Sequence, residues 1–158
     1  MTLSFLVIPG VLEARPITFI ESAEWNNLLI IGLFNVFDTA GRSIGGYTPL
    51  MIGMEETFLL HLFAFSRILI VIMAIMIEVG IFSGNLTAQN WLIIVNPMLL
   101  ALTNGYVQTI FACYAATAVS KNNVSDGQAR ALGSLIALAM TLGIAAGGLL
   151  QIPFAKIE

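Results

Sequence analysis

The sequence predicts an all-α fold, a polytopic bundle of transmembrane helices. Of the 158 residues, 58% are hydrophobic and only 9% are charged, whereas charges make up about 25% of the residues in a soluble domain. The mean hydropathy is +0.94. Four stretches reach the roughly 20 apolar residues that a helix needs to cross a bilayer. We therefore expect four full spans, preceded by a partial one at the amino terminus.

Short polar connections separate the predicted spans, and no hinge or linker divides the chain, so we expect one membrane domain over residues 1–158. The apolar run at 2–12 is about half a span long, which predicts the end of a helix that begins outside this sequence. It lacks the positively charged start and the cleavage site of a signal peptide. The predicted full spans cover residues 25–47, 57–82, 91–119 and 131–154.

An acid and a base lie inside the first predicted span. Asp38 and Arg42 are four residues apart and therefore share a helix face, with Asn35 one turn before Asp38. A charge near the bilayer centre costs roughly 2.5–3.5 kcal/mol. The pair could form a salt bridge that fixes helix packing, or a binding site in which the carboxylate accepts from hydroxyl groups and the guanidinium offers a planar fork of donors. We favour the binding site, because ionisable residues inside a membrane are usually functional.

Glycines recur at a four-residue spacing in the first and last spans. Gly41 and Gly45 form one such pair, and Gly143 and Gly147 form the other. This spacing lets a second backbone approach a transmembrane helix closely. We expect both pairs to serve packing, and we expect the last span to be a tightly packed helix with few chemical groups.

The second span carries three ionisable side chains whose roles the sequence leaves open. Arg67 either extends to the membrane interface or pairs with an acid elsewhere in the bundle. His61 is expected at the interface, with proton handling as the alternative. Glu78, near the other end of the span, is expected to reach water.

The third span combines a proline with buried amides. Pro97 removes one backbone donor and predicts a kink. Asn104 and Gln108 are four residues apart and share a face. They either line a cavity, as polar residues in broken transporter helices do, or hydrogen-bond to neighbouring helices. With Arg67, they are the candidate pathway or structural polar residues.

Basic residues near the helix ends predict the orientation of the chain. Arg42 and Arg67 flank the turn after the first span, whereas Lys121 and Arg130 flank the loop after the third. Because cytoplasmic loops carry an excess of Lys and Arg, we expect both connections on the cytoplasmic side and the carboxyl terminus outside.

Several function classes lack their sequence signatures. One cysteine, Cys113, excludes an intramolecular disulfide. No zinc spacing, phosphate-binding loop or nucleophile motif is present, so we expect no enzyme, no metal and no cofactor. The net charge of −3 and the lack of a basic run argue against a nucleic acid partner.

Three motifs resemble those of the equilibrative nucleoside transporters. The segment 34–42 is similar to the FN-x-x-D-x-x-GR signature of the eighth helix of that family. Ser66-Arg67, followed by an apolar run, is similar to its ninth helix. The tenth helix has an S/T-N-G-Y motif that 103–106 resembles. The likeness covers nearly all 158 residues in the same order.

The resemblance implies the carboxyl-terminal half of a major-facilitator-like transporter that has eleven spans in bundles of six and five. It implies alternating access for a nucleoside or nucleobase substrate, and ribose contacts from Asp38 and Arg42, with Asn35 a weaker candidate. It also implies an outside carboxyl terminus. The expected partners are that substrate, the lipid bilayer and an amino-terminal half that lies outside this sequence. The expected location is the plasma membrane, with an organelle membrane as the alternative.

A second interpretation stays open on the residues alone. Four apolar helices with glycine-rich faces are also typical of a small membrane protein that oligomerises through those faces. Such a protein would serve as a structural or regulatory subunit and would need no substrate at Asp38 and Arg42.

Overall fold

The computed structural model describes residues 17, 18, 20, 22–51, 57–81, 84–121 and 125–151, and the elements in these ranges are helices, as predicted. Three stretches within them are long and apolar enough to cross a membrane: Glu24–Tyr47, Leu86–Thr117 and Asp126–Leu149. A shorter apolar stretch covers Phe65–Ile77. The helices are α3 (Ala23–Met51), α4 (Thr57–Glu78), α5 (Leu86–Lys121) and α6 (Asp126–Gln151).

Polar caps set the starts of two helices, α5 and α6. At the start of α5, Asn85 Oδ1 accepts a hydrogen bond from the backbone N of Ala88 at 3.1 Å, as an N-cap does. α6 begins with a capping box: Gln128 Oε1 accepts from the backbone N of Ser125 at 3.3 Å, and Ser125 Oγ accepts from Gln128 N at 3.5 Å. Both helices therefore begin earlier than the apolar pattern predicts.

The end of α4 is a glycine C-cap. Gly80 has a φ of 82°, a conformation that glycine adopts without steric cost. Its backbone N donates to Ile77 O at 3.0 Å, and Ile81 N donates to Met76 O at 3.2 Å. This pair of bonds is the Schellman motif, and it ends α4 before the predicted position of 82.

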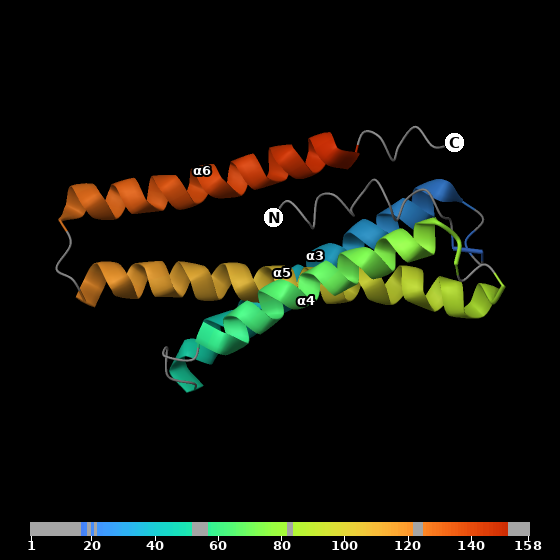
Figure 1. Cartoon of the computed structure of the whole chain (residues 1–158), viewed down its shortest axis with the longest axis horizontal. Coiled ribbons are helices and arrows are strands. Elements are labelled where there is room, and N and C mark those ends of the chain that lie inside the picture. Colours follow the sequence, from blue (N-terminus) through green and yellow to red (C-terminus); the bar gives the residue numbers. More distant parts are fainter. Residues whose placement is uncertain are drawn as a thin grey trace.

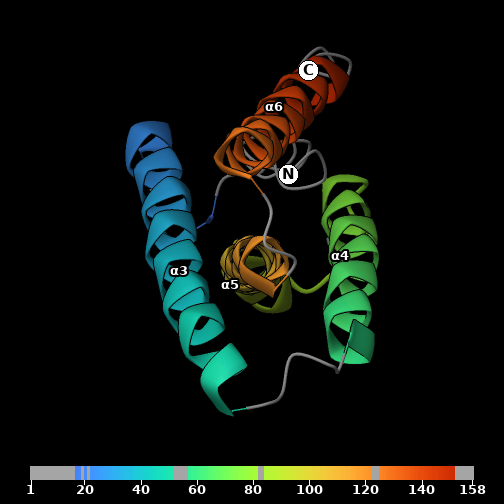
Figure 2. The ribbon, with the colours of Figure 1, turned by 90° about the vertical axis from the view of Figure 1, so that its left-hand side faces the viewer.

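α5 is the central helix, with α3 on one side of it and α4 on the other (Figures 1 and 2). α6 lies apart from the other three (Figure 2). α3 and α5 end, and α4 and α6 begin, at the same end of the molecule (Figure 1). This arrangement agrees with the prediction that the two connections face one side of the membrane.

Glycines bring α3 and α5 into backbone contact. A Cβ added at Gly41 would meet the carbonyl oxygen of Leu102, and one added at Gly45 would lie 2.9 Å from Tyr106 O. From the opposite helix, a Cβ at Gly105 would meet the carbonyl oxygen of Asp38. The packing role predicted for Gly41 and Gly45 is therefore confirmed.

The prediction that the last span is a tightly packed helix is wrong for the described part of this chain. Of the α6 side chains that the structure describes, Gly147 alone is buried, and leucines such as Leu135 and Leu149 are more than 60% exposed. The physical reason is the position of α6, which lies apart from the bundle that α3, α4 and α5 form (Figure 2).

An apolar core closes the other end of the bundle. Ile17, Ile30, Ile77 and Ile93 are fully or almost fully buried against one another. The buried Asn26 holds the segment before α3, because its Oδ1 accepts from the backbone N of Ile17 at 3.2 Å. This core anchors the start of α3 to α4 and α5.

α5 continues as one helix through Pro97. The residue before the proline, Asn96, is buried and donates from Nδ2 to the carbonyl of Ile70 on α4 at 2.9 Å. This bond joins α5 to α4 on the side opposite α3. The predicted kink stays a prediction.

Candidate functional site

Four polar side chains from three helices form a continuous hydrogen-bonded row. Arg42 Nε donates to Asp38 Oδ2 at 2.7 Å, an ion pair between neighbouring turns of α3. Asp38 Oδ1 accepts from Asn104 Nδ2 of α5 at 2.8 Å. Asn104 Oδ1 in turn accepts from a terminal nitrogen of Arg67 of α4, also at 2.8 Å. We call these four residues the polar row.

The glycine contact between α3 and α5 is what allows the row to form. Gly105 follows Asn104 directly, and a Cβ at Gly105 would lie 2.9 Å from the backbone N of Arg42. Because the two backbones touch here, the short side chain of Asn104 reaches the carboxylate of Asp38. The turn of α5 that carries the amide is thus held against the turn of α3 that carries the ion pair.

The orientation of the Asn104 amide is set by its two neighbours. An amide has one end that accepts and one end that donates. The accepting oxygen faces the Arg67 guanidinium, which only donates, and the donating nitrogen faces the Asp38 carboxylate, which only accepts. The reversed amide would place donor against donor and acceptor against acceptor, so one orientation is strongly favoured.

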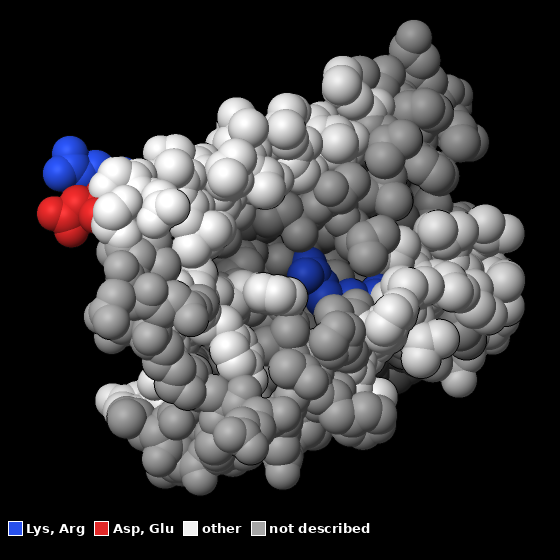
Figure 3. All heavy atoms as spheres, turned by 60° about the vertical axis from the view of Figure 1, so that its left-hand side comes forward, with Lys and Arg blue, Asp and Glu red and all other residues white. Residues whose placement is uncertain are grey.

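The row passes from a buried end to an exposed end. Asn104 is 2% exposed and Arg67 is 7% exposed, whereas the side chains of Asp38 and Arg42 are 13% and 52% exposed. Figure 3 shows basic side chains recessed within a hollow of one face. Within the described residues, Arg42 uses only its Nε, so its two terminal nitrogens are available to donate to a ligand.

The row carries two guanidinium groups and one carboxylate, and this composition limits what it can do. No group of three or more His, Cys, Asp or Glu side chains that could hold a metal exists among the residues that the structure describes. The row offers groups suited to binding: an exposed planar donor held by a largely buried acceptor, which can contact hydroxyl and carbonyl groups.

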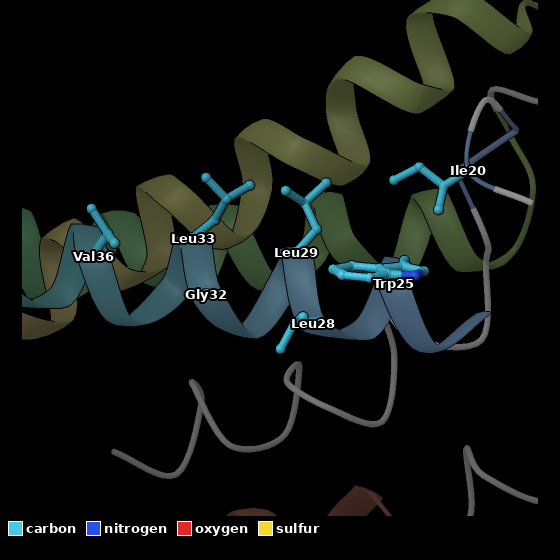
Figure 4. A pocket seen from close by; sticks show the side chains of 7 residues that line it. All are labelled: Ile20, Trp25, Leu28, Leu29, Gly32, Leu33 and Val36. Atoms are coloured by element: carbon cyan, nitrogen blue, oxygen red, sulfur yellow. The ribbon is translucent and has the colours of Figure 1, made fainter. Parts of the chain in front are cut away.

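Two hollows elsewhere on the described surface are lined by apolar side chains. One, of about 500 Å³, runs along α3 and is lined by Trp25, Leu29, Leu33 and three further apolar residues with Gly32 (Figure 4). The second, of about 400 Å³, lies between α5 and the beginning of α6 and is lined by alanines, Gly133 and larger aliphatic side chains. Neither offers the polar groups that orient a hydrophilic ligand.

Comparison with protein families assigns the chain to a family. The family model described as "Nucleoside transporter" matches residues 2–155. The chain belongs to the nucleoside transporter family. The resemblance of its three motifs to equilibrative nucleoside transporters is thereby confirmed, and the apolar helices make it an integral membrane protein. No curated protein and no solved structure matches the chain.

The structure brings together some of the predicted site residues of this transporter family member and separates others. Asp38 and Arg42 form the expected pair, with both carboxylate oxygens already accepting one bond each. Asn35, by contrast, is exposed on α3 and stands outside the row within the described residues. Gln108 is buried one turn beyond Asn104 on α5.

The structure also bears on the polar residues of the second and third spans. Arg67 is buried, and it is connected to the acid Asp38 through Asn104. Asn104 therefore forms hydrogen bonds to two neighbouring helices, which is one of the two roles predicted for it. The side chains of His61 and Glu78 lie outside the described residues.

Sequence reasoning missed the connection between the two motifs. The signal that could have found it is the glycine directly after Asn104, because a glycine beside a buried amide marks a close helix contact at that amide. Gly41 and Gly105 belong to the two motifs with family resemblance, and they are the residues that bring those motifs together.

Proposed function

We propose that the polar row binds nucleosides or nucleobases, and that the protein moves them across a membrane by alternating access. Membership in the nucleoside transporter family supports the substrate class. The observation that carries the proposal for this site is the half-exposed Arg42 guanidinium, fixed by Asp38 at one nitrogen and open at the other two.

Arg42 is the principal substrate contact in this proposal. Its terminal nitrogens would donate to the hydroxyl groups of the ribose, and the planar fork suits two neighbouring oxygens. Asp38 contributes in two ways. It holds the guanidinium plane in place, and each of its oxygens keeps a second lone pair that can accept from a sugar hydroxyl.

Alternating access would require a second bundle that moves against this one, with the substrate between them. The family resemblance assigns that role to an amino-terminal bundle, which makes such a bundle the proposed protein partner. The plasma membrane is the proposed location. No covalent step enters this mechanism, because the substrate is only bound, carried and released.

Uptake of radiolabelled uridine and adenosine tests the proposal, with the intact transporter expressed in transporter-deficient cells. We expect Asp38→Asn and Arg42→Ala to abolish most of the uptake at equal abundance in the membrane. Asp126→Asn and Arg130→Ala are matched controls, because they change the same residue types at exposed positions at the start of α6. We expect both controls to transport normally.

The same experiment separates the proposal from the alternative of a structural or regulatory subunit. Normal uptake by the Asp38→Asn and Arg42→Ala variants would show that the row is not a nucleoside site. Changed oligomerisation of those variants, with no effect on nucleoside uptake, would favour the subunit.

A further inference from the structure

We infer that Asn104 and Arg67 are positioning residues, which orient the substrate-binding Arg42 through Asp38 without touching the substrate. The inference rests on the proposed function, and it extends the binding site from one helix to three. It explains why a second arginine and an amide lie buried behind the ion pair.

The first step of the argument is the unbroken geometry of the row. Each of its three hydrogen bonds is between 2.7 and 2.8 Å long, which is the range of bonds to charged groups. Asp38 is the middle of the row: one oxygen bonds to Arg42 and the other to Asn104. A carboxylate held at both oxygens has a fixed orientation. A guanidinium that donates to it through Nε is held in place with it.

The second step is the distribution of exposure along the row. Asn104 and Arg67 are buried, so neither can meet a ligand directly, whereas Arg42 is half-exposed. A long, half-exposed arginine has many rotamers unless its guanidinium is anchored. The buried pair supplies an anchor that a substrate cannot displace, because it lies on the far side of Asp38.

The third step is the burial of the second cation itself. A buried charge is costly even when it is hydrogen-bonded, and apolar residues of similar size usually serve packing at least as well. Arg67 is linked to Asp38 through the neutral amide of Asn104. It therefore adds positive charge behind the carboxylate without occupying either of its oxygens, which leaves Asp38 free to hold Arg42.

Exchanging the two middle residues tests this inference. In the double variant Asp38→Asn/Asn104→Asp the carboxylate moves from α3 to α5, yet each hydrogen bond of the row retains a donor and an acceptor. In Asn104→Asp alone, two carboxylates face each other and the donor to Asp38 is lost. In Asp38→Asn alone, the row loses its negative charge.

We would measure the KM and the maximal rate of uridine uptake, together with membrane abundance, for the intact transporter and these three variants. We expect Asn104→Asp to raise KM about tenfold or more, the effect of losing a hydrogen bond to a charged group. We expect the double variant to have a lower KM than the worse single variant, because it restores a donor and an acceptor to each hydrogen bond of the row. Asn27→Asp, which adds the same charge near the start of α3, should leave KM unchanged.

A pair of Arg67 variants keeps the test decisive if Asn104→Asp fails to reach the membrane. Lys at position 67 retains a cation that can donate to Asn104, whereas Gln removes the charge. We expect Arg67→Gln to raise KM and Arg67→Lys to restore it most of the way. A purely structural role would lower abundance in both variants and leave KM alone.

The outcomes distinguish this inference from the proposed function. If Asn104→Asp or Arg67→Gln reaches the membrane and keeps the KM of the unsubstituted transporter, the positioning role is overturned while nucleoside transport stands. The positioning role is also overturned if the KM of the double variant is no lower than that of the worse single variant. If the unsubstituted transporter takes up no nucleoside, the proposed function fails and this inference fails with it.

Discussion

Replacing Gly41 by alanine tests the contact that assembles the polar row. The added methyl group would meet the carbonyl oxygen of Leu102 and would lie 3.0 Å from both the carbonyl carbon of Leu102 and the backbone N of Tyr106. These are backbone atoms of α5, so no side chain can rotate away. α3 and α5 would have to separate, and the bond between Asp38 and Asn104 would lengthen with them.

The control for this change is on the same helix. Gly46→Ala introduces the same methyl group where nothing lies within 4 Å. Both variants gain the same helix propensity, about 1 kcal/mol relative to glycine, so this gain cancels in the comparison. The difference between them is the cost of overpacking, about 1–3 kcal/mol, which corresponds to about a 5- to 150-fold difference in the unfolding equilibrium.

The measurement is unfolding of the purified protein in detergent, followed by far-ultraviolet circular dichroism. We expect Gly46→Ala to be as stable as the unsubstituted protein or more so, and Gly41→Ala to be less stable than Gly46→Ala by that amount. Equal stability of the two variants would refute the close backbone contact and, with it, the geometry that places Asn104 beside Asp38.

Three further predictions concern the helix ends and the buried end of the row. Asn85→Ala removes the cap of α5 and should lower the free energy of unfolding by about 1 kcal/mol, whereas the exposed Thr87→Ala should change it little, and thermal unfolding measures both. Gly80→Ala forces a left-handed conformation on alanine and should cost about 1–2 kcal/mol in the same assay. Arg67→Met leaves Asn104 Oδ1 without its guanidinium donor and should cost about 1–3 kcal/mol. The same change made in an Asn104→Leu background should cost clearly less, and equal costs in the two backgrounds would contradict the bond between them.

Helix number and approximate position were predictable from the sequence, because about 20 apolar residues in a row have few alternatives to a span. The ends were less predictable. Asn85 and Ser125 cap their helices with polar side chains, and a pattern of apolar residues places such positions in the loops. The Schellman turn at Gly80 likewise depends on backbone conformation and not on hydropathy.

Only part of the candidate site was predictable from the sequence, because part of it depends on contacts between helices. The pair of Asp38 and Arg42 follows from their spacing within one helix. The bonds of Asn104 to Asp38 and to Arg67 depend on the register between helices, which the sequence of a single helix does not contain. That register is set where Gly41 and Gly105 let two backbones touch.

The packing of α6 also depends on information that its own sequence does not contain. Its glycine spacing predicts a face on which another helix could pack. Whether a neighbour occupies that face depends on the rest of the assembly, and the described helices of this chain leave α6 largely exposed.

Equilibrium binding of labelled uridine to the purified intact transporter is the most direct test of the claim that Arg42 holds the substrate. Losing hydrogen bonds from a charged donor costs about 1.5–3 kcal/mol, so Arg42→Ala should weaken binding by about tenfold to 150-fold, while Arg130→Ala should bind as the unsubstituted protein does. If Arg42→Ala binds uridine with unchanged affinity, the polar row is not the nucleoside site.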